Sequence, residues 1–312
     1  MAKISAHDRG RCVARPGVQL SLAVLTTLTA ISAATCPAMA GTSITTCPYV
    51  ITVGGISNSP EVYKLKANLS CPYEDGIDIQ ASYVKLDLNG YSITGSGSGY
   101  GNGHGILVYS SGDRLTGITI TGPSPNLSAI QTFTYGIELD NVDDSTVENV
   151  VLSNNLYGLS TSLLNQVSNT VTRLQVLNNT ATLNGQNGIA LFNSTKSTVS
   201  GNLAAGNGTN PVNGGILIWA GDHNLVTLNN ADGNLVDGID IYNSTDNKVT
   251  WNSAFGNANA GILMFFDSTL NLVNHNTAKG NGKFDLGDYD VSCSTNTWSD
   301  DWFLTNNQSC VQ

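Results

Sequence analysis

Between residues 75 and 290 the chain alternates apolar and polar residues in short runs, which Asn, Gly, Ser and Thr interrupt. The clearest runs are GIALFNSTKSTVSGNLAAGN, from Gly188, and GIDIYNSTDNKVTWNSAFGN, from Gly238. An alternation with a period of two predicts strands joined by turns rather than helices. The expected class is therefore all-β.

These runs are copies of one repeat, numbered here from the residue before each Gly-Ile pair. Clear copies start at Tyr135, Asn187, Gly214, Asp237 and Ala260, and weaker copies start at Asp75, at His104 and near Gly158. The starts at 214, 237 and 260 lie 23 residues apart. Position thirteen is Val in the first four clear copies and, after one inserted residue, in the fifth. A unit this short cannot bury its own apolar face, so the copies must stack.

The predicted fold is a single-stranded, right-handed parallel β-helix of roughly nine coils over residues 75–290. At about 4.8 Å per strand the solenoid would be about 40 Å long. Residues 41–74 and 291–312 are expected to form the N-terminal and C-terminal caps, because an open β edge invites aggregation. Asn at a fixed turn position, with Asn193 and Asn243 as members, is expected to stack into an amide ladder. Leucine-rich repeats and propellers are excluded, because neither a Leu-x-x-Leu-x-Leu frame nor a period near 40 residues recurs.

Residues 1–40 have the pattern of a signal peptide. Arginines precede an apolar run from Val18 to about Ala34, and Ala38-Met39-Ala40 is a small-x-small cleavage site. No second apolar run of membrane length follows. The mature chain is thus expected to be secreted or periplasmic, without an integral membrane segment.

Removal of the signal peptide, with Cys12 and Cys36, leaves four cysteines. Cys47 and Cys71 precede the repeats, and Cys293 and Cys310 follow them. A long solenoid would hold these two pairs tens of Å apart, whereas a disulfide needs Cα atoms within about 7 Å. The predicted disulfides are therefore Cys47–Cys71 and Cys293–Cys310, one at each end.

Charge excludes one class of partner. The formal net charge is −10, whereas binding to nucleic acid phosphates needs a basic surface.

The stretch GIDIQASYVKLDLNGYSITG (76–95) and the closing DYDVSCSTNTWSDDWFLTNNQSC resemble the right-handed parallel β-helix repeat proteins of bacteria, the NosD-like group. The resemblance covers nearly all of the mature chain. It implies the fold, whereas for function it implies only a range that includes carbohydrate lyases, epimerases and accessory proteins.

Outward positions of the repeat are where a ligand would bind. Position six gives a row of aromatic residues on consecutive coils, namely Phe192, Trp219, Tyr242 and Phe265 or Phe266, after Tyr109 and Asp140 on earlier coils. Such a row suits the apolar faces of sugar rings and is predicted to bind substrate. The alternative is that the rings stack on one another and only stabilise the sheet.

Two sets of polar residues are candidates for catalysis. Lys196, His223 and Asp246 share position ten on successive coils, and a His beside a carboxylate is a common general acid or base. The alternative is an exposed column of paired charges. Asp240 points outward between Leu217 and Leu263, where burial would raise its pKa. Glu138 lies about four coils from Asp240, roughly 19 Å, too far for a glycosidase carboxyl pair.

No metal site is predicted, because three Met and four His, one of them in the signal peptide, do not form a copper site. Calcium is the one cofactor left open, through Asp285, Asp288 and Asp290. The alternative is that these residues are simple turn residues.

The functional hypothesis is an exported protein that binds polysaccharide or a cell-surface glycan along the aromatic row. Whether it also cleaves or epimerises the glycan, as a lyase or epimerase would, is left open. The alternative is a non-catalytic structural or surface-interaction protein of the cell envelope.

Overall fold

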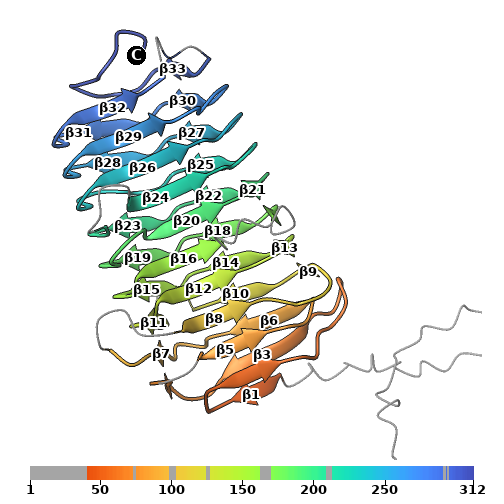
Figure 1. Cartoon of the computed structure of the whole chain (residues 1–312). Helices are drawn as coiled ribbons and strands as arrows, with labels where there is room; N and C mark the ends of the chain where they lie inside the picture. The colour runs from red at the N-terminus through yellow and green to blue at the C-terminus, as the bar shows by residue number, and fades with distance from the viewer. Residues whose placement is uncertain are drawn as a thin grey trace, which may run out of the picture. The chain divides into compact units, whose positions relative to one another are not determined.

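The computed structural model describes residues 41–72, 75–97, 103–123, 127–161, 170–208, 213–290, 293 and 295–312. The predicted signal peptide lies outside the described residues. Within them the chain forms β-strands and no α-helix, and every pairing between named strands is parallel. The all-β parallel solenoid is therefore confirmed (Figure 1).

Two long sheets form the broad faces of the solenoid. The ten-stranded sheet contains β2 (Tyr49–Ile51), β5 (Ile77–Ile79), β8 (His104–Val108), β12 (Tyr135–Leu139), β16 (Tyr157–Thr161), β20 (Ile189–Phe192), β24 (Gly214–Trp219), β26 (Asp237–Tyr242), β29 (Ala260–Phe265) and β32 (Phe284–Asp288). The eleven-stranded sheet contains β1 (Thr42–Ile44), β3 (Glu61–Leu65), β6 (Val84–Asp87), β10 (Thr119–Thr121), β14 (Thr146–Glu148), β18 (Gln175–Leu177), β22 (Thr198–Ser200), β25 (Leu225–Thr227), β27 (Lys248–Thr250), β30 (Leu272–Asn274) and β33 (Thr297–Ser299).

Shorter strands connect these faces. One six-stranded sheet contains β4 (Leu69–Ser70), β7 (Ile93–Thr94), β11 (Ala129–Gln131), β15 (Val151–Ser153), β19 (Thr180–Thr182) and β23 (Leu203–Ala205). Single bridges through Asn230 link β23 to β28 (Ser253–Phe255), which pairs with β31 (Thr277–Lys279). A four-stranded sheet contains β9 (Leu115–Thr116), β13 (Val142–Asp143), β17 (Val171–Thr172) and β21 (Ser194–Thr195).

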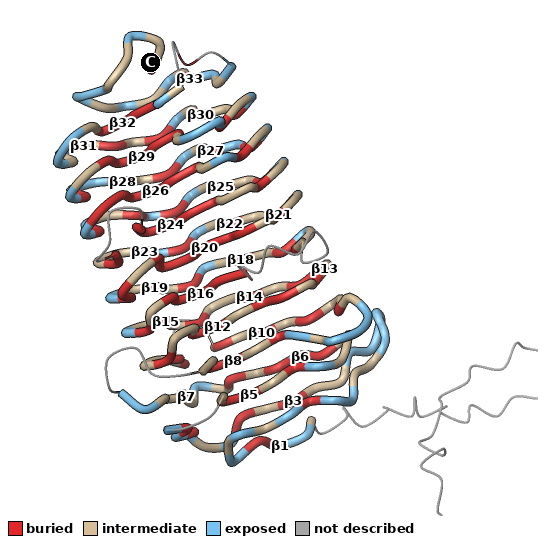
Figure 2. Tube along the Cα trace, viewed as in Figure 1, coloured by how far each residue is buried: buried red, intermediate tan, exposed pale blue. Residues whose placement is uncertain are grey.

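Equivalent positions of the repeat stack in register along the solenoid. On the ten-stranded sheet one column of fully buried residues contains Ile189, Ile216, Ile239, Ile262 and Leu286. The predicted valine at position thirteen forms the corresponding column of the eleven-stranded sheet, which Trp298 closes. Buried residues accordingly line the inside of every coil (Figure 2). Aliphatic columns of this kind supply most of the apolar surface that folding removes from water.

The number of coils agrees with the prediction. All strands of the ten-stranded sheet except β2 lie between residues 75 and 290, which leaves nine. The first coil begins earlier, because β1 to β4 pair in parallel with the strands that follow them. Residues 41–72 are thus the first turn of the solenoid as well as its end. Among the described residues no helix is long and apolar enough to span a membrane.

Asparagine ladders run along three columns of turns, none of which is the column of Asn193 and Asn243. The ladders are Asn179–Asn202–Asn229–Asn252–Asn276, Asn155–Asn184–Asn207–Asn234–Asn257–Asn281 and Asn224–Asn247–Asn271–Asn296. The prediction of Asn193 and Asn243 as ladder members was wrong. Both residues instead adopt a left-handed backbone, with φ of 49° and 46°, which Asn tolerates better than most residues.

Both predicted disulfides are present. Cys47–Cys71 and Cys293–Cys310 join Cα atoms 5.8 Å and 6.0 Å apart, near the two ends of the solenoid.

Candidate functional site

The outer face of the ten-stranded sheet holds the aromatic row. Strand pairing places Phe192 beside Trp219, Trp219 beside Tyr242 and Tyr242 beside Phe265, so Phe265 rather than Phe266 continues the column. Neighbouring ring centroids lie 5.9, 4.3 and 5.6 Å apart. These distances mean that the rings contact one another, as the structural alternative expected.

The row is not uniformly accessible. The side chain of Phe192 is 4% exposed, whereas Trp219, Tyr242 and Phe265 are partly exposed. Farther toward the N-terminus, Tyr109 is exposed and Asp140 is buried. A ligand that contacts the row would therefore do so at its C-terminal part.

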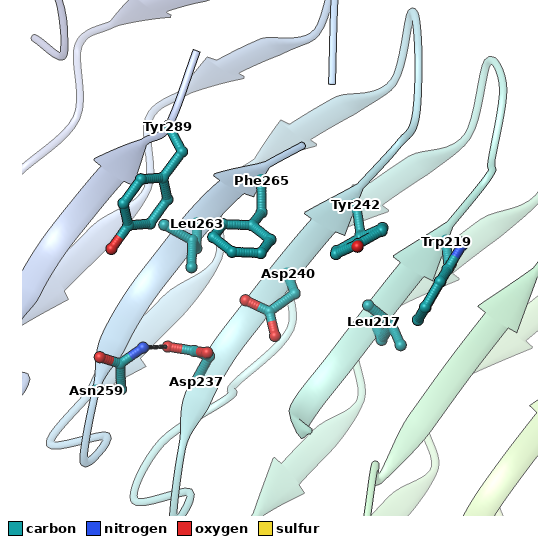
Figure 3. Close-up of a pocket in the computed structure, with 9 residues that line it drawn as sticks. All are labelled: Leu217, Trp219, Asp237, Asp240, Tyr242, Asn259, Leu263, Phe265 and Tyr289. Atoms are coloured by element: carbon teal, nitrogen blue, oxygen red, sulfur yellow. Dashed lines mark hydrogen bonds between the residues drawn. The ribbon is translucent and has the colours of Figure 1, made fainter. Parts of the chain in front are cut away.

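A cavity of about 160 Å³ opens beside this accessible part. A buried water needs about 10–15 Å³ of such space, so the cavity has room for a ring-sized group. Its walls are the aromatic residues Trp219, Tyr242, Phe265 and Tyr289, the apolar residues Leu217 and Leu263, and the polar residues Asp237, Asp240 and Asn259 (Figure 3). We call this cavity the aromatic-acid pocket.

Asp240 is the polar centre of the pocket. Strand pairing puts Leu217 and Leu263 directly on either side of it, as the sequence predicts. The residue is 6% exposed, and its Oδ1 atom is buried without a hydrogen-bond partner. Burial, and then the negative charge of Asp237, raise the pKa of Asp240 well above its usual range. Raising the pKa by burial favours the protonated carboxyl, because an apolar surrounding disfavours charge.

Asp237 is a pocket residue that the sequence analysis did not single out. Its Oδ1 accepts hydrogen bonds from the Asn259 side chain and from the backbone N–H of Ala260, both at 2.7 Å (Figure 3). Burial raises the pKa of Asp237 despite these bonds and despite the positive charge of Lys283, which both lower it.

The predicted charged column exists but lies apart from the pocket. His223 contacts Asp222 through Nδ1 and Asp246 through Nε2, each at 2.7 Å, and its side chain is 52% exposed. Lys196 precedes His223 by one coil, because the bridges of Thr195 with Asp222 and of Asp222 with Thr245 put these turns in register. None of Lys196, His223 and Asp246 lines the aromatic-acid pocket. Their catalytic role stays a prediction.

A second polar cluster, around His104, was missed at the sequence level. The imidazole contacts Asp75 through Nδ1 at 3.0 Å and Glu138 through Nε2 at 2.6 Å. Its ring stacks on Tyr135, which stacks on Tyr157, with centroids 5.2 and 5.1 Å apart. Asp75, His104 and Tyr135 all occupy position one of the repeat, as does Asp237, so that shared position was the signal that could have found both clusters.

Glycine at position two explains why position one reaches the outer face. A Cβ atom on Gly238 would lie 2.5 Å from the Gly261 carbonyl oxygen and 2.8 Å from the Asn257 side-chain amide. Gly238 therefore faces the inside of the solenoid, where it packs against the asparagine ladder that contains Asn257. Its neighbour Ile239 also points inward. Two consecutive inward residues break the alternation, so Asp237 and Asp240 can both line the outer pocket.

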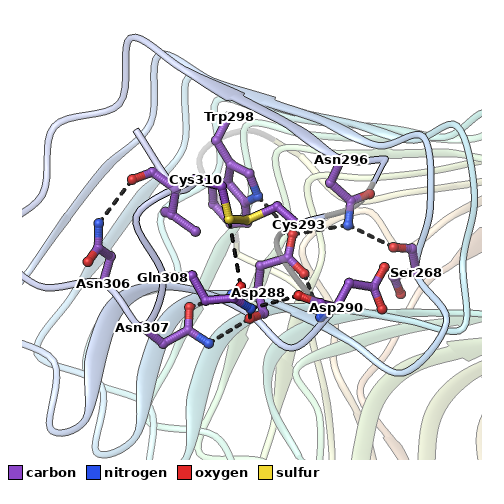
Figure 4. The surroundings of a disulfide bond; sticks show 11 residues. Ser268, Asp288, Asp290, Cys293, Asn296, Trp298, Asn306, Asn307, Gln308 and Cys310 are labelled. Atoms are coloured by element: carbon purple, nitrogen blue, oxygen red, sulfur yellow. Dashed lines mark hydrogen bonds between the residues drawn. A yellow bond between two sulfur atoms is a disulfide. The ribbon is translucent and has the colours of Figure 1, made fainter.

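The three aspartates considered for calcium take part in the C-terminal end of the solenoid. Asp285 accepts hydrogen bonds from Asn281, and Asp288 accepts them from the Asn296 side chain and the Trp298 indole, next to the Cys293–Cys310 disulfide (Figure 4). The backbone N–H of Asp290 donates to Asp288. Within the described residues no group of three or more His, Cys, Asp or Glu side chains is arranged to hold a metal ion.

Comparisons with solved structures show the same fold at low identity. An alginate lyase from Paenibacillus sp. str. FPU-7 is 12% identical with a TM-score of 0.56, over 85% of this chain and 89% of the lyase. The enzymatically active domain of tailspike protein 2 from bacteriophage CBA120 is 15% identical with a TM-score of 0.58, over 86% of this chain and 42% of that one. The Dettilon tailspike protein gp208 is 13% identical with a TM-score of 0.54, over 85% of this chain. This chain spans 62% of that tailspike's length.

No curated protein is significantly similar to this chain in sequence. The finer resemblance to the NosD-like group stays a prediction. The family model described as the right handed beta helix region matches residues 104–309. The chain therefore belongs to the right-handed β-helix family.

Proposed function

We propose that this protein binds polysaccharide on the outer face of the ten-stranded sheet, with one sugar residue in the aromatic-acid pocket. The observation that carries the proposal is Asp240, a buried carboxyl with an unpartnered oxygen in a cavity walled by aromatic rings. Sugar sites combine apolar walls with a few placed polar groups in this way. The solved structures with this fold include an alginate lyase and phage tailspikes, which is consistent with a glycan partner.

Asp240 also has the property that a proton donor needs. Burial favours the protonated form of this carboxyl, which is the form that can protonate a leaving glycosidic oxygen. Cleavage or epimerisation of the bound glycan is therefore the catalytic extension of the proposal. The disulfides agree with an extracellular or periplasmic setting, since such bonds persist in oxidising compartments.

The second candidate is a solenoid with a purely structural role. The contacts among Phe192, Trp219, Tyr242 and Phe265 favour it, because rings that stack on each other already stabilise the sheet.

A panel of neutral, acidic and amino-containing polysaccharides separates the two candidates. We expect the purified protein to be retained on at least one glycan, and Trp219→Ala to weaken that retention about tenfold or more, the effect typical of losing a buried aromatic contact. Trp251→Ala, which removes an exposed indole outside the pocket, is the matched control. Absence of retention on every glycan contradicts the proposal and leaves the structural candidate.

The catalytic extension has its own readout in the products, followed by chromatography. Products that Asp240→Asn abolishes would identify Asp240 as the acid. If the products are unsaturated uronates, and His223→Ala abolishes them, the protein would instead be a lyase that uses the charged column. Retention without products leaves a binding protein.

A further inference from the structure

The aromatic-acid pocket has an unusual charge character for a site in a polysaccharide-binding protein. Two carboxyl side chains line it, Asp237 and Asp240, and none of the lining residues is Lys, Arg or His. A uronate or another acidic sugar would find no cation among these lining residues, and the ammonium of Lys283, at the rim, already donates a hydrogen bond to the Tyr289 hydroxyl. A buried charge without a partner is strongly disfavoured, so acidic sugars fit this pocket poorly.

The aromatic walls favour the opposite charge. An ammonium group is attracted to the faces of Trp, Tyr and Phe rings within about 6 Å. The protein's own Lys283 shows this at the rim of the pocket, where its ammonium nitrogen lies 5.5 Å from the ring centroid of Tyr289 and 5.1 Å from that of Phe284. The same nitrogen donates a hydrogen bond of 2.8 Å to the Tyr289 hydroxyl.

The unpartnered Oδ1 of Asp240 completes the set of groups that an ammonium would use. It is a buried acceptor without a donor, and an ammonium offers three donors. We infer that the sugar residue in the aromatic-acid pocket carries a protonated amine, so that the ligand is a glycan with free amino groups. The inference rests on the proposed function, since it names the class of sugar that the same pocket holds.

Binding of such a sugar would release one proton. Burial favours the protonated form of Asp240 in the free protein, whereas a bound ammonium stabilises the carboxylate, so the O–H proton passes to solvent as a carboxylate–ammonium pair forms. With an amino sugar, Asp240 is thus an anchor of the ligand and not its proton donor. The flanking residues on β24 and β29, Leu217 and Leu263, are not ionisable. The ionisable groups that face Asp240 are Asp237 on its own strand and the hydroxyls of Tyr242 and Tyr289, with Lys283 beyond Asp237. Affinity for the amine should therefore rise with pH until Asp240 is ionised.

Calorimetry tests this with a disaccharide of glucosamine and the same disaccharide with both amines acetylated. We expect the amine to bind at least about tenfold more tightly, as a charge-assisted hydrogen bond would give. Titration in two buffers of different ionisation enthalpy should show release of about one proton. Asp240→Asn should reduce affinity for the amine about tenfold or more and abolish the proton release. Its thermal unfolding should stay close to that of the parent, because an uncharged amide of the same shape replaces a carboxyl whose uncharged form burial favours.

Asp113→Asn is the control, because it makes the same Asp-to-Asn replacement at an exposed carboxyl, in the loop between β8 and β9 and outside the pocket. It should leave both readouts unchanged. Equal affinity for the two disaccharides, or preference for the acetylated one, overturns the inference while the proposed function stands. An equal loss of affinity in both variants also overturns it, because the net charge of the protein would then attract the amine. Unchanged affinity in Asp240→Asn overturns it as well, because Asp240 would then not contact the amine. Failure to bind these or any glycan contradicts both proposals.

Discussion

His104 lies between the carboxylates of Asp75 and Glu138, so the stability of the first coils should depend on the charge of its imidazole and hence on pH. Burial alone would lower the pKa of His104, but the hydrogen bonds to Asp75 and Glu138 outweigh burial and raise the pKa to about 9. The same contact lowers the pKa of Asp75. Because the three residues come from β8, β12 and the segment before β5, the charged imidazole links three successive coils.

The charge on His104 should stabilise the protein up to about neutral pH and progressively less above it. An unfolded histidine has a pKa near 6.5, so the stabilisation is complete below about pH 6.5 and is lost as pH rises through about 9. His104→Gln should therefore lower the free energy of unfolding at pH 7 by up to about 3 kcal/mol, and by much less at about pH 10. Denaturant unfolding at both pH values measures this difference.

His223→Gln is the control for that experiment. It removes an imidazole from a similar pair of carboxylates, but one that is half exposed and should contribute about 1 kcal/mol or less. An effect of His104→Gln that does not change between the two pH values would show that packing on Tyr135, rather than charge, is what the imidazole provides.

Some residues of the site could be predicted from their position in the repeat, and others could not. Asp240 and the aromatic row follow from the alternation of inward and outward residues, which the register confirms. Asp237 and His104, at position one, could not be found that way. Strict alternation places position one on the inside, but the Gly at position two and the Ile at position three both face inward, so position one faces outward instead. That contact between coils is a tertiary property that no single copy of the repeat reveals.

At the scale of the repeated elements, each asparagine ladder ends on an aspartate. Each interior rung donates its backbone N–H and a side-chain N–H to the Oδ1 atom of the residue on the next coil, as Asn229 does to Asn252. The residue that follows the last asparagine of a ladder accepts hydrogen bonds from it but has no further rung to which it could donate. A carboxylate suits this place, because it only accepts. Asp301 and Asp285 each accept both N–H groups of the last asparagine, and Asp288 accepts the side-chain amide of the third ladder. Two of the aspartates considered for calcium thus have a structural explanation.

An interior rung of a ladder and an asparagine outside the ladders should respond differently to substitution. Asn252→Ala leaves the backbone N–H and one side-chain N–H of Asn229 without an acceptor, although its amide keeps the bond to the Val199 carbonyl, and each unsatisfied group costs about 1–3 kcal/mol. Asn243→Ala, outside the ladders, is the control and should cost less. Thermal unfolding of the two variants measures this contrast, and equal losses would mean that the ladder contributes no more than an ordinary turn.

Asp301→Asn should stabilise the protein above about pH 6. Burial raises the pKa of Asp301 to about 6, although its bonds from Asn276 lower it. Since the folded pKa exceeds the unfolded value near 3.9, stability falls as pH rises from about 4 through 6. The neutral amide of Asn keeps an oxygen that accepts the hydrogen bonds from Asn276 and does not titrate. We expect the free energy of unfolding to rise by about 1 kcal/mol, after allowance for the unpaired N–H groups of the new amide. Chemical unfolding at about pH 4 and pH 7.5 checks it, and an equal difference at both values would contradict the assignment.

At the scale of the whole molecule, the fold could be predicted because the repeat applies one rule at every coil. A period of 23 residues with valine at position thirteen requires stacking, and stacking then dictates parallel sheets in register. The ends are less predictable, because they lack a neighbour. Residues 41–72 join the first coil through β1 to β4, although their sequence carries no clear copy of the repeat. Here pairing with the next coil, rather than local pattern, determines the strands.

Because each coil contacts only its neighbours, damage at one end should stay local. The Cys293–Cys310 disulfide closes a segment of 17 residues, for which loop entropy predicts a loss of about 3 kcal/mol on removal. The disulfide lies beside Asp288, where the Trp298 indole and the Asn307 and Gln308 side chains donate hydrogen bonds (Figure 4). Replacement of both cysteines by Ser should thus loosen β32 and β33 first.

Hydrogen exchange measures this directly. Amides of β32 and β33 should exchange faster in the double variant, while those of β5 to β12 keep their protection. Tyr289 directly follows β32 and lines the aromatic-acid pocket, so glycan affinity should also fall. The matched replacement of Cys47 and Cys71 should accelerate exchange in β2 and β4 and leave glycan affinity unchanged. Faster exchange in all coils of either variant would instead mean that the solenoid unfolds as one cooperative unit, and the ends would then control the stability of the whole sheet.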